Sequence, residues 1–136
     1  MARPIANARH PMLSLLLPIP IVCFVGALLT DLSYMNSGGN FLWINFSSWL
    51  IAAGLVFGGI AIVILIVDAI RGSVSWLPFL LVGAAWVVEL LNALIHARDG
   101  WSAVVPMGMI LSILGVLLIL AGGWSSRATR LAGDAR

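Results

Sequence analysis

Charged residues are scarce in this 136-residue chain, at 9% of the sequence against about 25% in a typical soluble domain. Hydrophobic residues make up 62%. The single cysteine, Cys23, lies in an apolar run, so no disulfide framework or cysteine metal cluster can form within one chain. No basic face or aromatic stacking platform is present, which argues against a nucleic-acid partner. The composition therefore predicts an integral membrane protein.

The N-terminal residues do not predict a cleavable signal peptide. Arg3 and Arg9 precede the first apolar run, but no small-x-small cleavage site follows it, and Pro18 and Pro20 interrupt it. We therefore expect the first apolar run to remain in the protein as a membrane span.

Four apolar runs are long enough to cross a bilayer as helices. Turn-forming residues around Gly38 and Gly39 predict a loop over residues 33–45, and a short polar tail is expected over residues 125–136. We predict an all-α, four-helix transmembrane bundle that forms a single domain over residues 1–136. The spans are expected at about residues 12–32, 46–70, 77–97 and 102–124.

The placement of the arginines predicts the orientation of these spans. Four spans put both termini on the same side of the membrane, and six of the seven basic residues fall on that side. The positive-inside rule then makes both termini cytoplasmic. The six arginines on the terminal side are Arg3, Arg9, Arg71, Arg127, Arg130 and Arg136, and Arg98 lies on the other.

The third apolar run carries a carboxylate, an amide and an imidazole at helical spacing. At about 100° per residue, Glu89, Asn92 and His96 fall within roughly 60° of one another on a helix face. Ionisable groups that face lipid are costly, so this face should point into the bundle. Burial should keep Glu89 largely protonated at neutral pH. Together with Asp31, which closes the first span at the level of His96, these residues are the candidate intramembrane polar site.

A second candidate site combines His10 and Asp68 on the cytoplasmic face. The first span starts there and the second span ends there, and pairing would lessen the cost of burying either side chain. The alternative for Asp68 is an i, i+3 interaction with Arg71 at the interface.

The chemistry of these residues leaves cofactor binding open. The chain shows no nucleophile–base–orienter triad and no phosphate loop, so we expect no enzyme activity. His10 and His96 are separated by roughly 30 Å of bilayer, too far for one haem, whereas His96 with Met107 stays open. His96, Asp31 and Asp99 do not have a recognised metal-ligand spacing. We predict no metal and no cofactor, with a redox subunit that binds haem b or quinone as the alternative.

The leading function is passage or sensing of a proton, an ion or a small solute along the polar face, or a role as a membrane subunit or anchor. A hydrogen-bonded cluster that only holds the helices together is the structural alternative. Two small-residue faces, Gly54/Gly58 and Gly108/Ser112, would allow close approach of a second copy or a membrane partner.

Short motifs spread over nearly the whole chain carry a family resemblance: His10-Pro11 and Pro18 in the first span, Asp31 at its end, Gly54 and Asp68 in the second span, and Asn92 in the third. With these, the chain resembles the domain of unknown function family 2231, small predicted membrane proteins of bacteria. The resemblance implies an inner-membrane location and marks His10, Asp31 and Asp68 as the family's polar positions. Glu89 and the stretch 93–99 look like a subgroup feature.

Some relatives in that family carry a fused Rieske iron–sulfur domain, which implies redox chemistry or membrane anchoring. This chain lacks the cysteine and histidine ligands of such a centre. The family has no settled biochemical role, so the resemblance bears on fold and location rather than on activity.

Overall fold

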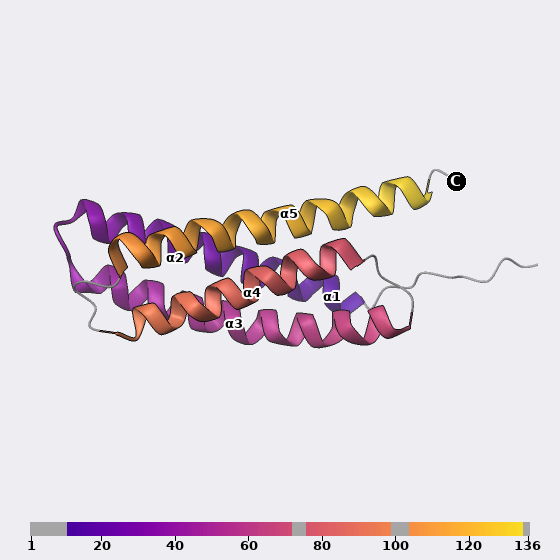
Figure 1. Ribbon diagram of the computed structural model, residues 1–136, viewed down its shortest axis with the longest axis horizontal. Coiled ribbons are helices and arrows are strands. Elements are labelled where there is room, and N and C mark those ends of the chain that lie inside the picture. The colour runs from indigo at the N-terminus through magenta and orange to yellow at the C-terminus, as the bar shows by residue number, and fades with distance from the viewer. Residues whose placement is uncertain (1–10, 72–75, 99–103, 135–136) are drawn as a thin grey trace, which may run out of the picture.

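The computed structural model describes residues 11–71, 76–98 and 104–134, and these contain helices and no strands (Figure 1). Four of the helical segments are long and apolar enough to cross a membrane, which confirms the predicted all-α, four-span architecture. The elements in chain order are α1 (Pro11–Leu16), α2 (Pro18–Asn36), α3 (Phe41–Ile70), α4 (Trp76–His96), the π-helical turn η1 (Val104–Gly108) and α5 (Met109–Asp134).

The first span consists of α1 and α2, which are divided at Leu17. Pro18 and Pro20 supply no N–H to the helical ladder, so the regular hydrogen-bond pattern is interrupted there. Leu17 keeps right-handed helical dihedrals and donates to the Leu13 carbonyl at 3.0 Å. The span therefore continues through the prolines without a loop.

The loop predicted over residues 33–45 is wrong in its extent, because only residues 37–40 lie between α2 and α3. The Asn40 side chain accepts a hydrogen bond from the Leu42 N–H at 3.1 Å and caps α3. The two glycines of the turn have φ of 70° and 92°, which glycine adopts without steric cost. Helix α3 therefore begins five residues before the predicted span.

The last span also differs from the prediction at both ends. Val105 has extended dihedrals (φ −115°, ψ 121°) because Pro106 disfavours helical geometry in the residue before it. Regular α-helix therefore begins at Met109 rather than near residue 102. At the other end, α5 continues to Asp134, through the stretch predicted as a tail, because arginine, alanine and leucine there favour a helix and no proline intervenes.

The helices form a ring in which α2 packs along α3, α3 along α4, α4 along α5 and α5 along α2. Helices α2 and α4 therefore lie diagonally across the bundle. Figure 1 shows α1 and the C-terminal part of α5 at one end, which we call the terminal end. The turn at residues 37–40 and η1 lie at the opposite end, which we call the loop end.

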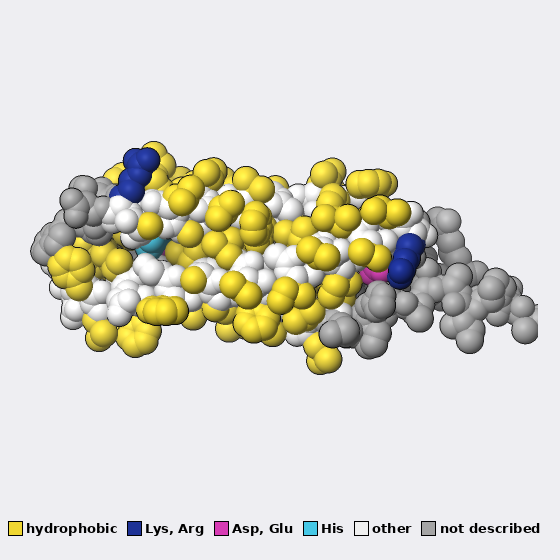
Figure 2. All heavy atoms as spheres, turned by 90° about the horizontal axis from the view of Figure 1, so that it is seen from below, with side chains coloured by type: hydrophobic (Ala, Val, Ile, Leu, Met, Phe, Trp, Pro, Cys, Tyr) yellow, Lys and Arg dark blue, Asp and Glu magenta, His cyan; other side chains and the backbone are white. Residues whose placement is uncertain are grey.

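The outside of the bundle is apolar along the spans. Large hydrophobic side chains point outward from every span; Leu29, Val63, Leu94 and Leu117, one from each, are 58–60% exposed. Figure 2 shows hydrophobic side chains over most of one face, with basic side chains only towards its two ends. An apolar exterior is what hydrocarbon requires of a spanning helix.

The Gly54/Gly58 face lies inside the bundle. A Cβ atom at Gly54 would lie 2.8 Å from Cδ1 of Phe24, and one at Gly58 would lie 3.2 Å from Cδ1 of Trp86. The Trp86 indole reaches across this face and donates to the Leu55 carbonyl at 2.9 Å. Within the chain, this small-residue face therefore packs against α2 and α4, and its use by a partner stays a prediction.

We expect Gly54→Ala to lower the free energy of unfolding by about 1–3 kcal/mol, because its methyl group would overlap the fully buried Phe24 ring. Gly83→Ala is the matched control, since a Cβ there meets no atom within 4 Å. Unfolding of both variants in mixed micelles measures the difference. Equal stability of the two variants would show that the ring moves aside without cost.

Candidate functional site

Six polar side chains from the four spans meet inside the bundle, towards the loop end. All six residues are buried, with exposures of 0% except for His96 at 6%. Hydrogen bonds connect them into one cluster, which we call the buried polar network. Its members are Asp31 from α2, Ser47 from α3, Glu89, Asn92 and His96 from α4, and Ser112 from α5.

The Asp31 carboxyl is the centre of this network. Oδ1 accepts a hydrogen bond from the Ser47 hydroxyl at 2.6 Å, and Oδ2 accepts one from the Ser112 hydroxyl at 2.6 Å. Nε2 of His96 lies 2.9 Å from Oδ1. One carboxyl on α2 therefore contacts a side chain from each of the other three spans. Buried polar groups need such partners because hydrocarbon offers none.

The geometry around His96 determines how many protons the Asp31–His96 pair holds. Nδ1 lies 3.0 Å from the Asn92 carbonyl oxygen, which can only accept, so Nδ1 carries a hydrogen. A hydrogen bond between Nε2 of His96 and Oδ1 of Asp31 then requires one proton between these two atoms. Whether that proton sits on the imidazole or on the carboxyl, the pair is neutral overall. A neutral pair is the form that a buried site tolerates best.

Asn92 links this pair to Glu89. Its amide donates to the Ser112 hydroxyl at 2.8 Å and to Oε2 of Glu89 at 3.0 Å, which uses both amide hydrogens. Oε1 of Glu89 and Oδ1 of Asn92 are buried and have no hydrogen-bond partner among the described residues. The part of the network around Glu89 and Asn92 therefore has two acceptor oxygens to which no described group donates.

Two glycines make room for the side chains of α4. A Cβ atom at Gly115 would overlap the Glu89 carboxyl, and one at Gly108 would lie 3.1 Å from Cε1 of His96. Gly108 also faces Oδ1 of Asn92, 3.5 Å from such a Cβ. The face formed by Gly108 and Ser112, which we expected to allow a partner to approach, instead packs against α4 within the chain.

Apolar layers enclose the network on both sides along the bundle axis. Towards the loop end, Tyr34, Ile44 and Val104 form one buried cluster. Towards the terminal end, a second buried cluster closes the bundle one turn beyond the network. The members of this second cluster, which we call the apolar layer, are Phe24, Ala85, Val116 and Ile119.

The structure brings together all four residues of the predicted intramembrane site. The helical spacing of Glu89, Asn92 and His96 predicted one shared face, and all three are buried on α4. Sequence reasoning missed the role of Ser47 and treated Ser112 only as a small packing residue. Nothing in the sequence distinguishes these serines from others in apolar helices, because serine also bonds to its own helix.

The second predicted site is described only in part. Asp68 is 4% exposed near the end of α3, and its Oδ2 has no hydrogen-bond partner among the described residues. His10, its expected partner, lies outside the described residues, and so does Asp99 of the suggested metal set. The pairing of His10 with Asp68 stays a prediction.

The arrangement also bears on haem binding. His96 uses both ring nitrogens within the network, so ligation of a haem iron would require breaking one of these contacts. Met107, the other suggested axial ligand, is 53% exposed, whereas His96 is enclosed. In this conformation both ring nitrogens of His96 have partners within the network.

The fold and the enclosed network define a multi-pass membrane protein built around a buried acid–imidazole centre. Comparison with protein families agrees with the membrane class: residues 9–128 match the family described as predicted membrane protein (DUF2231). The chain belongs to this family. Comparisons with curated proteins and with solved structures found no significant match.

We expect Ser112→Ala to lower the free energy of unfolding by about 1–3 kcal/mol, because Asp31 loses a donor and the Asn92 amide loses an acceptor. Ser48→Ala is the matched control, since its hydroxyl bonds only to the Ile44 carbonyl of its own helix. That variant should stay within about 0.5 kcal/mol of the wild type. Indistinguishable unfolding curves for the two variants would mean that the network adds no stability.

Proposed function

We propose that the protein is a non-enzymatic proton sensor of the bacterial inner membrane, with the buried polar network as the sensing element. The observation that carries the proposal is the Asp31 carboxyl, on which α2 meets α3, α4 and α5 through hydrogen bonds. A change in the protonation of one pair therefore acts on all four helices at once.

The proton count of the Asp31–His96 pair supplies the mechanism. With its single proton, the pair forms a favourable contact at 2.9 Å across the bundle diagonal. Removal of that proton would leave two acceptors facing each other, and addition of a second would remove the carboxylate charge that attracts the imidazolium. Either change weakens the direct link between α2 and α4. A two-state contact of this kind is what a histidine-based switch needs.

The neighbours of the pair favour this response. Glu89 is the other titratable side chain of the network, linked through Asn92, while α3 and α5 contribute the hydroxyls of Ser47 and Ser112. The unpartnered oxygen of Glu89 favours the neutral acid, because an ionised carboxylate there would be buried without sufficient donors.

We infer that proton access is from one side, which favours sensing over passage. His96 ends α4 and is the network residue of that helix nearest the loop end, although its imidazole is enclosed, with 1% of the side chain exposed. In the opposite direction, the apolar layer separates the network from the terminal end. We therefore expect protons to reach the pair from the loop end, which we place outside the cytoplasm.

Spin labels at Met35 and Leu94, both exposed residues of α2 and α4, test the switch when introduced as cysteines in a Cys23→Ser background. We expect the interspin distance to change by on the order of 1–2 Å between about pH 5 and 8. His96→Gln should abolish the change, because no imidazole remains to exchange the proton. His10→Gln, the same substitution at the other histidine, should leave it intact. Labels that respond equally with and without His96 would refute the switch.

Proton flux into liposomes separates sensing from passage. We expect no flux above that of protein-free vesicles. Flux in the wild type that Glu89→Gln abolishes, while melting stays unchanged, would replace sensing by passage. Glutamine is the appropriate change because it keeps a donor and an acceptor beside Asn92 and removes only the proton.

We further propose that both termini are cytoplasmic, on the evidence of six of seven arginines at the terminal side. A reporter active only in the periplasm, fused after Arg136, should stay silent. The same reporter inserted in the turn at residues 37–40 should be active. The reverse result would place the sensing end in the cytoplasm.

A further inference from the structure

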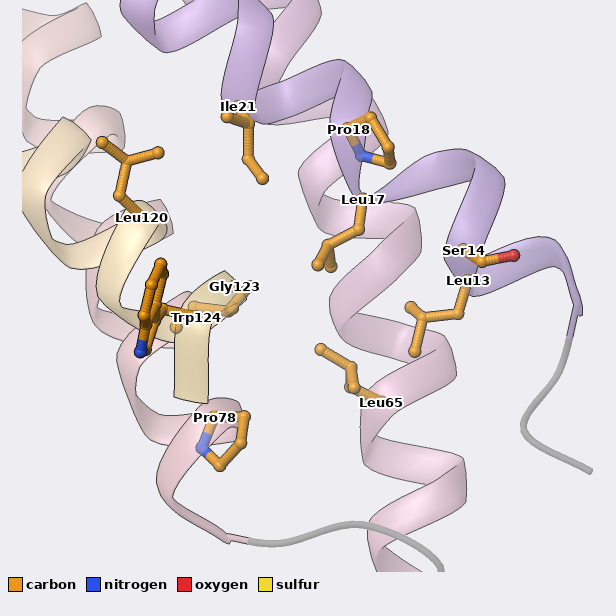
Figure 3. Close-up of a pocket in the computed structure, with 12 residues that line it drawn as sticks. Leu13, Ser14, Leu17, Pro18, Ile21, Leu65, Pro78, Leu120, Gly123 and Trp124 are labelled. Atoms are coloured by element: carbon orange, nitrogen blue, oxygen red, sulfur yellow. The ribbon is translucent and has the colours of Figure 1, made fainter. Parts of the chain in front are cut away.

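An apolar cavity of about 580 Å³ lies towards the terminal end of the described part of the chain (Figure 3). All four spans line it, and the Ser14 hydroxyl and the Trp124 indole N–H are the polar side-chain groups among the described lining residues. Its volume falls within the range of roughly 300–1,000 Å³ that is typical of small-molecule sites. The walls include Leu17 and Ile21 of the first span, Leu65 of α3, Pro78 of α4, and Leu120 and Trp124 of α5.

The cavity does not belong to the buried polar network. The apolar layer separates the two, because Ile21 and Val82 of the cavity wall lie one turn beyond Phe24 and Ala85. Figure 3 shows Leu17, Ile21, Leu65 and Leu120 pointing into the same space from three spans. A site with these walls suits a hydrocarbon chain and offers nothing to an ion.

The charge at this end of the bundle has one dominant sign. Six of the seven arginines belong to the terminal side by sequence. On α5, Leu120 and Gly123 line the cavity, and position 127, an arginine, follows on the same helix face one turn nearer the terminal end. Arg71 ends α3 at this end and is exposed. Basic residues at the ends of spans beside a gap between them are typical of sites for anionic lipid headgroups.

We infer that this cavity binds one acyl chain of an anionic phospholipid, whose phosphate lies at the terminal end beside the ends of α3 and α5, where Arg71 and positions 127 and 130 fall. This binding site goes beyond the proposed sensing function and does not depend on it. The apolar walls select a hydrocarbon chain, and the surrounding positive charge selects the headgroup. A neutral lipid satisfies only the first requirement.

A pair of glycine variants tests whether an acyl chain occupies the cavity. A Cβ atom at Gly123 would make only an ordinary contact, 3.7 Å from Cδ1 of Ile21, so Gly123→Leu adds volume inside the cavity with little clash. Gly83→Leu adds the same volume on α4, where a Cβ meets no atom within 4 Å. Both variants should have the same melting temperature as the wild type. A difference in lipid binding between them would then show that the lipid occupies the cavity.

Native mass spectrometry of the purified full chain, with added dioleoyl phosphatidylglycerol or dioleoyl phosphatidylcholine, measures lipid retention. We expect the wild type and Gly83→Leu to retain one phosphatidylglycerol per chain in preference to phosphatidylcholine. Gly123→Leu should bind phosphatidylglycerol about tenfold more weakly. Arg127→Gln should reduce the preference for the anionic lipid about fivefold, the effect of one basic residue near a membrane surface.

Each other outcome overturns the inference. Equal retention by Gly123→Leu and Gly83→Leu would place bound lipid outside the cavity. Equal retention of the two lipids by the wild type would remove the role of the arginines. Loss of every lipid from the wild type would show that no lipid site exists.

Discussion

A single buried carboxyl constrains this bundle more than any other group. Asp31 sits in a membrane-spanning helix with no exposed surface, where an unpartnered acid would be very costly. Its oxygens accept from Ser47 and Ser112 and meet His96, so each of the other three helices must present one polar side chain at the same depth. The positions of the helices along the bundle axis follow from this requirement.

Hydrocarbon supplies no hydrophobic force to hold spanning helices together, because lipid tails are as apolar as leucine. Many large side chains of this protein accordingly face outward, and the contacts between helices combine glycine and polar residues with apolar clusters. Gly54 admits the Phe24 ring, and Gly115 admits the Glu89 carboxyl. Close backbone approach and buried hydrogen bonds thus add to the apolar contacts inside the bundle.

The interior changes character along its axis. The buried polar network occupies the half towards the loop end, the apolar layer crosses the middle, and an apolar cavity occupies the half towards the terminal end. A proton can be held in the first of these compartments and a hydrocarbon chain in the last. The apolar layer keeps the two apart, which is why the proposed sensing site and the proposed lipid site can be tested independently.

The sequence by itself determined the four spans and the shared face of Glu89, Asn92 and His96, because hydropathy and helical periodicity are local properties. It also predicted correctly that Asp31 lies near that face, since a residue's depth in a span follows from counting along the helix. It placed the ends of α3 and α5 poorly, because capping by Asn40 and helix formers in a polar tail extend helices beyond their apolar parts.

Only the tertiary structure decided which serines belong to the network. Ser47 and Ser48 are adjacent in one apolar helix, yet Ser47 donates to Asp31, whereas Ser48 donates to the Ile44 carbonyl of its own helix. Either kind of bond satisfies a serine hydroxyl, so local chemistry does not choose between them. The choice depends on the rotation of α3 about its axis, which packing against α2 and α4 sets and which no local pattern in the sequence encodes.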